Sequence, residues 1–186
     1  MFFSQINDGH SSEIIFSDDE NGVSASGSSL TAFFVQPSLV NTQHATKVTI
    51  RNHEIDSNFF SSFGELTTEK CNHLIFEKCT FPDGFQEFYE LPFSNISITN
   101  SELIDKDFER LFCCLNPYKL TGNLDLSNNK MGKDEVTIME VLSQKLPDIF
   151  AVDTLNFSGN PMRKDFVKEL QEEYKGRTEI IYDGIS

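Results

Sequence analysis

The feature that most constrains how this chain can fold is a short pattern that recurs along its length. In each copy, two apolar residues are separated by one residue. A small polar or thiol residue follows three positions after the second of them, and a third apolar residue follows two positions later. The clearest copy is LDLSNNKM, residues 124–131. A partial sixth copy is expected at Ile180. Apolar residues at every second position are typical of a β-strand, so each copy predicts a short strand. The five complete copies begin at Val48, Leu74, Ile96, Leu124 and Leu155.

The segments between the copies carry apolar residues at helical spacing, and each ends in Pro or Gly. Pro cannot continue the hydrogen-bond ladder of a helix, and Gly accepts the left-handed conformation that closes one. Each repeating unit is therefore predicted to be a strand, a turn and a helix, which makes the fold class α/β. The apolar residues of the four predicted helices are Phe85, Phe88 and Tyr89; Phe108, Leu111, Phe112 and Leu115; Val136, Met139, Leu142 and Leu146; and Phe166, Leu170 and Tyr174.

The two units LDLSNNKMGKDEVTIMEVL and LNFSGNPMRKDFVKEL resemble the leucine-rich repeat, and in particular its ribonuclease-inhibitor-like subclass. The earlier units match less closely, because Phe, Val and Ile replace several of the leucines. The resemblance implies a leucine-rich-repeat solenoid, a short curved horseshoe with a parallel β-sheet on its concave side and helices on its convex side. The alternative is an ordinary α/β domain in which strands and helices alternate.

The chain divides into residues 47–186, where about five units and a C-terminal cap are expected, and residues 1–46, which differ in composition. This N-terminal segment has no Lys or Arg, and a Ser- and Gly-rich stretch occupies residues 24–29. The ends of a stacked repeat array expose its core and need capping. We therefore expect an N-terminal cap in residues 1–46 with one or two irregular strands; a partly disordered acidic segment is the alternative.

The polar position of each copy lies where the chain turns out of its strand. Backbone groups at such a turn lack strand partners, and leaving one buried and unbonded costs about 1–3 kcal/mol. A side-chain amide can bond these groups, whereas a hydroxyl or thiol does so less completely. His53 occupies this position in the first copy and departs most from the pattern. We therefore assign a structural ladder, and no ligand-binding role, to Cys79, Ser101, Asn129 and Asn160.

The chain is strongly acidic, with 29 Asp and Glu against 15 Lys and Arg and a formal net charge of −14. Binding to nucleic acid requires clustered Lys and Arg that neutralise phosphates, and an anionic membrane surface also attracts basic proteins. The composition therefore argues against both and favours a partner protein with a basic surface or cleft. No apolar stretch approaches the roughly 20 residues of a transmembrane helix, so no membrane insertion is expected. The chain itself is expected to be a monomer.

The four cysteines include no CxxC pair, and the N-terminus lacks the basic start and long apolar run of a secretory signal. Reduced thiols in a cytoplasmic protein are therefore expected. Small, degenerate repeat proteins of this kind also resemble the secreted effectors of intracellular bacteria. In that case the C-terminal stretch KELQEEYKGRTEIIYDGIS would be a secretion signal and the protein would act in a host cytosol. The same stretch fits a capping helix and a last strand.

The sequence contains none of the common signatures of catalysis or of a bound cofactor. It lacks a metal-binding HExxH, a phosphate loop, a GxSxG elbow and a dinucleotide fingerprint. The sharpest enzymatic alternative is a nucleophile formed by Cys71 and His73. A catalytic thiol needs an electropositive setting, however, which an acidic chain does not favour. We therefore expect no enzymatic activity, no cofactor and no metal site.

Function is expected on the side of the sheet that the helices leave open, because the resemblance implies that this is the protein-binding surface. Large residues usually anchor an interface, and Arg51, Ile75 and Glu77 are the candidates. The chain is therefore predicted to occlude or inhibit a partner protein, such as an enzyme, through its concave face and rim loops. The alternative is an adaptor that recruits an enzyme or a host protein without inhibiting it. Strand alternation directs ten residues to the open side: Thr49, Arg51, Ile75, Glu77, Ser97, Thr99, Asp125, Ser127, Asn156 and Ser158.

Overall fold

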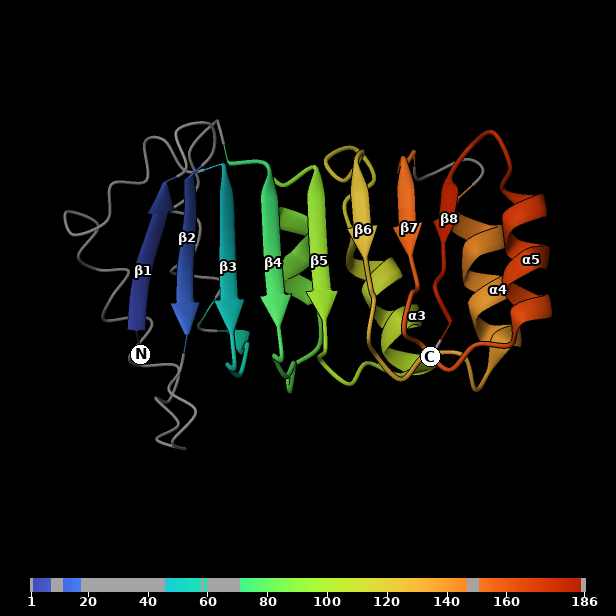
Figure 1. The fold of residues 1–186 in the computed structure, drawn as a ribbon, viewed down its shortest axis with the longest axis horizontal. Helices are drawn as coiled ribbons and strands as arrows, with labels where there is room; N and C mark the ends of the chain where they lie inside the picture. The colour runs from blue at the N-terminus through green and yellow to red at the C-terminus, as the bar shows by residue number, and fades with distance from the viewer. Residues whose placement is uncertain are drawn as a thin grey trace.

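The described strands form one eight-stranded sheet, in which each strand lies next to the strand that follows it in the chain (Figure 1). β1 and β2 are antiparallel, and every strand from β2 to β7 is parallel to the next. The computed structural model describes the side chains of residues 46–57, 59, 71–146 and 151–184, and the backbone of residues 2–7 and 12–17. The strands are β1 (Phe2–Asn7), β2 (Ser12–Ser17), β3 (Lys47–Arg51), β4 (His73–Glu77), β5 (Asn95–Thr99), β6 (Asn123–Asp125), β7 (Thr154–Asn156) and β8 (Glu179–Ile181).

Strands β3 to β8 are the six predicted from the repeated pattern, and their register confirms a parallel sheet. The first apolar residue of each copy is aligned with that of the next, as in Leu74 with Ile96 and Leu124 with Leu155. The aligned side chains are buried. Because alternate residues of a strand face opposite sides of the sheet, the second apolar residue of each complete copy is buried on the same side. The apolar alternation in the sequence therefore sets which side of the sheet faces the core.

Of the described helices, the earlier ones lie behind the sheet in the view of Figure 1, and the last two lie beyond β8 on the right. The described helices are η3 (Gln86–Glu90), α3 (Asp105–Cys114), α4 (Glu135–Lys145) and α5 (Lys164–Glu173). The last three confirm predicted α-helices, but η3 is a short 3-10 helix. Only seven residues separate Gly84 from Pro92, and both residues disfavour a helix interior. Too little chain is left there for a stable α-helix.

The buried side of α4 differs from the prediction. Val136 is 66% exposed and Met139 is only partly buried, whereas Ile138, Val141 and Leu142 are buried. The helix sequence EVTIMEVLSQK carries apolar residues around most of its circumference. The spacing therefore fits two overlapping apolar stripes that share Leu142, one with Val136 and Met139 and the other with Ile138 and Val141. Packing against the rest of the protein buries the stripe with Ile138 and Val141.

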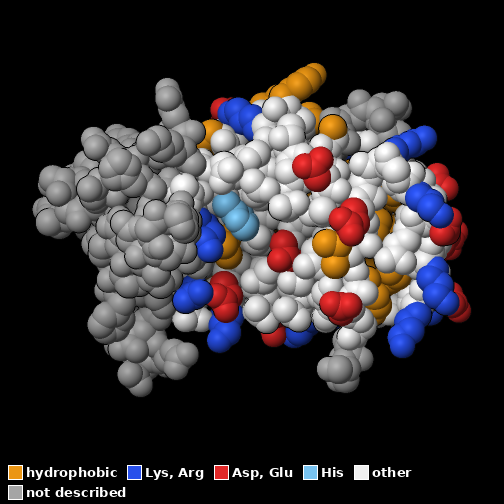
Figure 2. Space-filling view, turned by 45° about the horizontal axis from the view of Figure 1, so that its top comes forward, with side chains coloured by type: hydrophobic (Ala, Val, Ile, Leu, Met, Phe, Trp, Pro, Cys, Tyr) orange, Lys and Arg blue, Asp and Glu red, His pale blue; other side chains and the backbone are white. Residues whose placement is uncertain are grey.

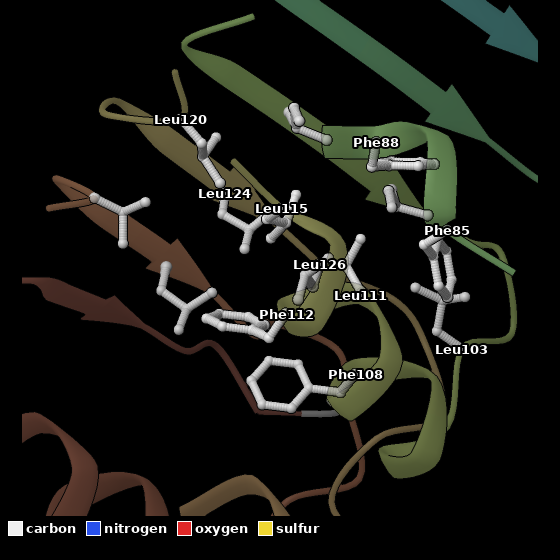
Figure 3. Close-up of a cluster of buried hydrophobic side chains, with 14 of the residues drawn as sticks. Phe85, Phe88, Leu103, Phe108, Leu111, Phe112, Leu115, Leu120, Leu124 and Leu126 are labelled. Carbon is white, nitrogen blue, oxygen red and sulfur yellow. The ribbon is translucent and has the colours of Figure 1, made fainter. Parts of the chain in front are cut away.

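The core lies between the sheet and the helices, and Figure 3 shows its central part. Leu124 and Leu126, from β6 and the residue after it, extend toward Leu111 and Phe112 of α3. The rings of Phe108 and Phe112 have centroids 4.5 Å apart, and Phe108 also packs on Phe157, which lies two units further along the chain, at 5.7 Å. Burying one such side chain contributes about 1.5–3 kcal/mol. Contacts between successive units thus make the core continuous.

A buried carboxylate also ties successive units together. Asp105, at the start of α3, accepts hydrogen bonds from the backbone N–H groups of Gly132, Lys133 and Asp134, at 2.5, 3.1 and 2.8 Å. These three residues precede α4. Since the first N–H groups before and within a helix need acceptors outside it, one carboxylate positions the start of the next helix.

Two strands of the sheet belong to the segment 1–46. β2 pairs with β3 in parallel, with Glu13 aligned to Lys47 and Ser17 to Arg51. The sheet therefore continues across the boundary predicted after residue 46. The remainder of the segment, including the Ser- and Gly-rich stretch at residues 24–29, lies outside the described residues. The N-terminal cap and its boundary stay predictions.

Candidate protein-binding surface

Every second side chain of the strands points away from the helices, and together these side chains form a surface that we call the open face. Strand alternation places them on the side opposite the buried apolar residues. Among the described helices, none covers this side (Figure 1). The open face comprises Lys47, Thr49 and Arg51; His73, Ile75 and Glu77; Asn95, Ser97 and Thr99; Asn123, Asp125 and Ser127; Thr154, Asn156 and Ser158; and Glu179, Ile181 and Asp183.

Three residues predicted to contact a partner are buried. Thr49 is 1% exposed, Ser97 6% and Ser127 8%. Their side chains are short and lie among longer neighbours, and the Oγ of Ser97 lies 2.9 Å from the Nε2 of His73. They offer almost no surface to a partner, which corrects the prediction. Strand alternation fixes the side of the sheet that a residue faces, but it does not set the depth of a short side chain.

The other seven predicted residues are partly exposed, and two of the three predicted anchors are paired with each other. The Nε of Arg51 donates a hydrogen bond to the Oε2 of Glu77 at 2.6 Å, across β3 and β4. A partner that contacts either side chain must compete with this ion pair. Ile75, on the same strand as Glu77, is an apolar residue of the open face and is partly exposed. The partly exposed residues are Arg51, Ile75, Glu77, Thr99, Asp125, Asn156 and Ser158.

Asp125 and Asn156 hold the backbone where the chain leaves β6 and β7. The Oδ1 of Asp125 accepts a hydrogen bond from the N–H of Ser127, and the Oδ1 of Asn156 accepts one from the N–H of Ser158, both at 2.9 Å. One oxygen of each side chain is therefore occupied by a local turn. The second carboxylate oxygen of Asp125 and the amide nitrogen of Asn156 are the groups that a partner can bond.

The open face also contains residues that the sequence analysis did not select. Three of them link neighbouring strands: the Oδ1 of Asn95 accepts from the N–H of Asn123 at 2.9 Å, and the Oγ1 of Thr154 donates to the Oδ1 of Asn123 at 2.5 Å. Extending each predicted strand by one residue toward its N-terminus would have identified most of the missed residues. They are Lys47, His73, Asn95, Asn123, Thr154, Glu179, Ile181 and Asp183.

From β5 to β8, the described part of the open face carries carboxylates but no Lys or Arg. Its carboxylates are Asp125, Glu179 and Asp183, and none of them forms an ion pair with another described residue. Figure 2 shows Asp and Glu side chains across this part of the surface, with Lys and Arg toward its edges. Carboxylates without counterions create a negative potential that attracts a positively charged partner.

The residues of the structural ladder are buried and bond to the backbone. Asn129 accepts from the N–H groups of Ser101 and Leu103 and donates to the carbonyls of Ile98, Leu126 and Ser127. Asn160 accepts from the N–H of Met131 and donates to the carbonyls of Leu126 and Phe157. Ser101 and Cys79 make fewer bonds of the same kind. The polar atoms of these side chains are therefore occupied by backbone groups of the turns, and few of them can bond to a ligand.

Cys71 and His73 lie in different surroundings. Cys71 is buried, and its burial raises the pKa of the thiol to about 11. At neutral pH the thiol is therefore protonated, whereas a nucleophile requires the thiolate. His73 lies on the open face beside Ser97. In the part of the chain that the structure describes, no group of three or more His, Cys, Asp or Glu side chains could hold a metal ion. Within the same residues, no helix has the length and apolarity needed to cross a membrane.

Comparison with known proteins adds no assignment to this geometry. A scan against protein-family models finds no match, and a search of curated proteins finds no similar sequence. The residues and contacts described above are therefore the basis for a functional proposal.

Proposed function

We propose that this chain is a non-catalytic protein-binding module of the leucine-rich-repeat type, which occludes a partner protein, such as an enzyme, by covering it with the open face. The repeated sequence pattern and the chain-order parallel sheet support the repeat assignment. The observation that carries the proposed function is a parallel sheet with one uncovered side in its described part, on which Asp125, Glu179 and Asp183 form no ion pair with any other described residue. Parallel sheets normally have both sides covered by other parts of the protein, so a partner is the natural cover for this side.

The partner is expected to have a basic surface. The whole chain carries a net charge of −14. Part of this negative charge lies on the uncovered side, from β5 to β8. Complementary charge steers association and disfavours wrong partners more than it adds affinity. A protein with Lys or Arg around the surface to be covered therefore fits best.

The proposal is tested by blocking the open face and comparing the captured proteins. The variant Thr99→Arg/Glu179→Arg adds bulk and positive charge to this surface, and Ser143→Arg/Glu109→Arg makes the same change of charge on exposed positions of α4 and α3. Each chain is immobilised and used to capture proteins from a cell lysate, and the bound proteins are quantified by mass spectrometry. Loss of a captured protein with the first variant, but not with the second, is the expected result. Equal capture by all three chains would refute binding through the open face.

A second candidate function, an adaptor, is favoured by a groove on the helix side. The groove has a volume of about 280 Å³ and lies between α4 and α5, with Val136, Met139 and Phe166 among its lining residues. The ion pair of Glu135 and Arg163 borders it, with the Nε of Arg163 2.8 Å from a carboxylate oxygen of Glu135. That hydrogen bond lowers the pKa of Glu135. A second contact surface is what an adaptor requires and an inhibitor does not.

Activity assays of a captured enzyme separate the two functions. An inhibitor should abolish turnover when it is added in excess over the enzyme, and the open-face variant should leave turnover unchanged. An adaptor should leave turnover intact while bound, and a substitution in the helix-side groove, Val136→Arg, should then remove one captured protein without removing the other.

A further inference from the structure

Two exposed tyrosines lie in adjoining loops at the edge of the sheet where the strands begin. Tyr118 is 87% exposed and Tyr89 is 48% exposed, and both are among the exposed large apolar side chains of the described residues. Their loops adjoin, because the amide nitrogen of Asn116 donates to the carbonyl of Tyr89 at 3.0 Å and the Nζ of Lys119 donates to the carbonyl of Glu90 at 3.2 Å. We call Tyr89 and Tyr118 the rim tyrosines.

The loop that presents Tyr118 is held in one conformation. Asn116 is buried, and its Oδ1 accepts from the N–H of Tyr118 at 3.0 Å. Its backbone carbonyl accepts from the N–H groups of Lys119 and Leu120, and the side chain of Leu120 is buried in the core. A fixed loop loses little conformational freedom on binding, so an aromatic side chain on it is a pre-organised contact.

The rim tyrosines are continuous with the acidic part of the open face. The chain runs from Tyr118 to Gly122, whose N–H donates to the carbonyl of Ser94 beside β5, and then directly into β6. Figure 2 is turned so that this edge comes forward; it shows hydrophobic side chains at the rim and Asp and Glu side chains on the surface below. The loop that carries Tyr118 therefore leads directly into β6, the strand that carries Asp125 of the open face.

We propose that the rim tyrosines and the open-face carboxylates together bind an Arg- and Lys-rich segment of a partner protein. This inference rests on the proposed function and specifies its partner. A guanidinium group stacks on the face of a tyrosine ring, which carries negative charge density, and Tyr118 has an accessible ring on a fixed loop. Further cations of the same segment pair with Asp125 and Glu179 on the open face. Tyrosine is also among the residues that most often dominate interface energetics.

The test uses random dodecapeptides displayed on phage and selected on the immobilised chain. The selected peptides are expected to be enriched in Arg and Lys. One of them, synthesised with a fluorescent label, then serves as the probe in anisotropy titrations. Tyr118→Ala should weaken its binding about tenfold, which lies between the values for an exposed and for a fully desolvated cation–π contact. Tyr118→Phe keeps the ring face and should stay within about threefold of the wild type. Tyr118→Leu keeps an apolar side chain without a ring and should weaken binding as Tyr118→Ala does.

Two controls separate this inference from general attraction to an acidic protein. Ile104→Ala removes an exposed apolar side chain at the start of α3 and should leave peptide affinity unchanged. Ser143→Arg/Glu109→Arg should reduce affinity less than Thr99→Arg/Glu179→Arg, which has the same change of charge. Because Tyr118 is exposed, its variants should unfold at the same urea concentration as the wild type.

The possible failures are distinguishable. Selected peptides without an excess of Arg and Lys would overturn the inference about the partner. Peptides that depend on the open face, but bind Tyr118→Ala and the wild type equally well, would overturn the role of the rim tyrosines and leave the proposed function standing. Peptides that bind both double-arginine variants equally would overturn both.

Discussion

The turns after β6 and β7 are held by amides, whereas those after β4 and β5 are held by a thiol and a hydroxyl. Asn129 makes five hydrogen bonds to backbone groups, and Asn160 makes three. At the equivalent positions, Ser101 makes two bonds, and the sulfur of Cys79 lies 3.4 and 3.6 Å from two carbonyl oxygens. The side chains at this equivalent turn position therefore make very different numbers of hydrogen bonds to the backbone.

The difference shows how many backbone N–H and C=O groups of a turn a single side chain can satisfy. An amide has two donors and an acceptor with two lone pairs, a hydroxyl has one donor, and a thiol is only a weak donor. In the unit that contains Cys79, hydrogen bonds between backbone groups satisfy part of the turn. The N–H of Thr80 donates to the carbonyl of His53, and the N–H of Ile55 donates to the carbonyl of Thr80. The amide-held turns should therefore depend more on one residue than the thiol-held turn does.

The largest effect is expected from Asn129→Ala. It leaves the N–H groups of Ser101 and Leu103 and the carbonyl of Ile98 without their partner in a buried site. Each unsatisfied group costs about 1–3 kcal/mol, and partial entry of water reduces the sum, so we expect a loss of about 4 kcal/mol in the free energy of unfolding. Urea unfolding followed by circular dichroism measures it.

Asn128→Gly is the matched control for this prediction. Asn128 is exposed and has a φ of 57°, a conformation that Gly adopts readily. The control should therefore change the free energy of unfolding by less than about 0.5 kcal/mol. If Asn129→Ala is as stable as this control, the turn after β6 does not depend on the amide.

Asn160→Ala should have the second-largest effect, because Asn160 bridges the last two complete units with fewer bonds. The substitution leaves the N–H of Met131 and the carbonyl of Leu126 without this partner. We expect a loss of about 2–3 kcal/mol, again from urea unfolding. Asn160→Ser retains one donor and one acceptor and should recover part of the loss. Equal stability of the Ala and Ser variants would argue that lost packing, and not lost hydrogen bonding, causes the effect.

Alkaline pH should destabilise the chain through the buried thiol of Cys71, which lies just before β4. The amides that hold the turns after β6 and β7 do not titrate. Burial raises the pKa of Cys71 to about 11 from its ordinary value of 9.0. Between these values the unfolded chain releases this proton while the folded chain retains it, so the free energy of unfolding falls as the pH rises. The expected slope from this group is about −1.4 kcal/mol per pH unit. Urea unfolding from pH 8.5 to 10.5 should show a steeper fall for the wild type than for Cys71→Ala. Parallel curves would contradict the raised pKa.

Ser101→Ala should have the smallest effect. It removes the acceptor for the N–H of Cys79 and a donor to the carbonyl of Thr99, which costs about 1 kcal/mol. Ser143→Ala, on the exposed side of α4, is the control and should not destabilise the chain. A loss for Ser101→Ala as large as that for Asn129→Ala would remove the distinction between the two kinds of turn.

The sheet could be predicted from the sequence because it follows from short-range patterns. Alternation at Leu124 and Leu126, and at the equivalent positions of the other copies, sets both the strands and their register. The buried side of α4 could not be predicted in the same way, because Val136 and Ile138 both lie on apolar stripes of that helix. Only packing against neighbouring elements separates the two.

The candidate surface was predicted less well than the fold. Alternation identified the side of the sheet on which Arg51, Glu77 and Asp125 lie, but it could not show that Thr49 is buried among its neighbours. Tyr118 lies in a loop without any period, and its exposure depends on the hydrogen bonds of Asn116. Surface properties of this kind arise from contacts between units, which no single unit encodes.

The equivalence of Asn129 and Asn160 has a consequence for how such a chain can lengthen. Each amide donates to the carbonyl of the second apolar residue in its own copy and in the preceding one, Ile98 and Leu126 for Asn129 and Leu126 and Phe157 for Asn160. A duplicated segment of 31 residues, the spacing between these two asparagines, would present matching donors and acceptors at both of its junctions. Gene duplication or engineering could therefore add whole units here, and every added unit would enlarge the open face by one strand.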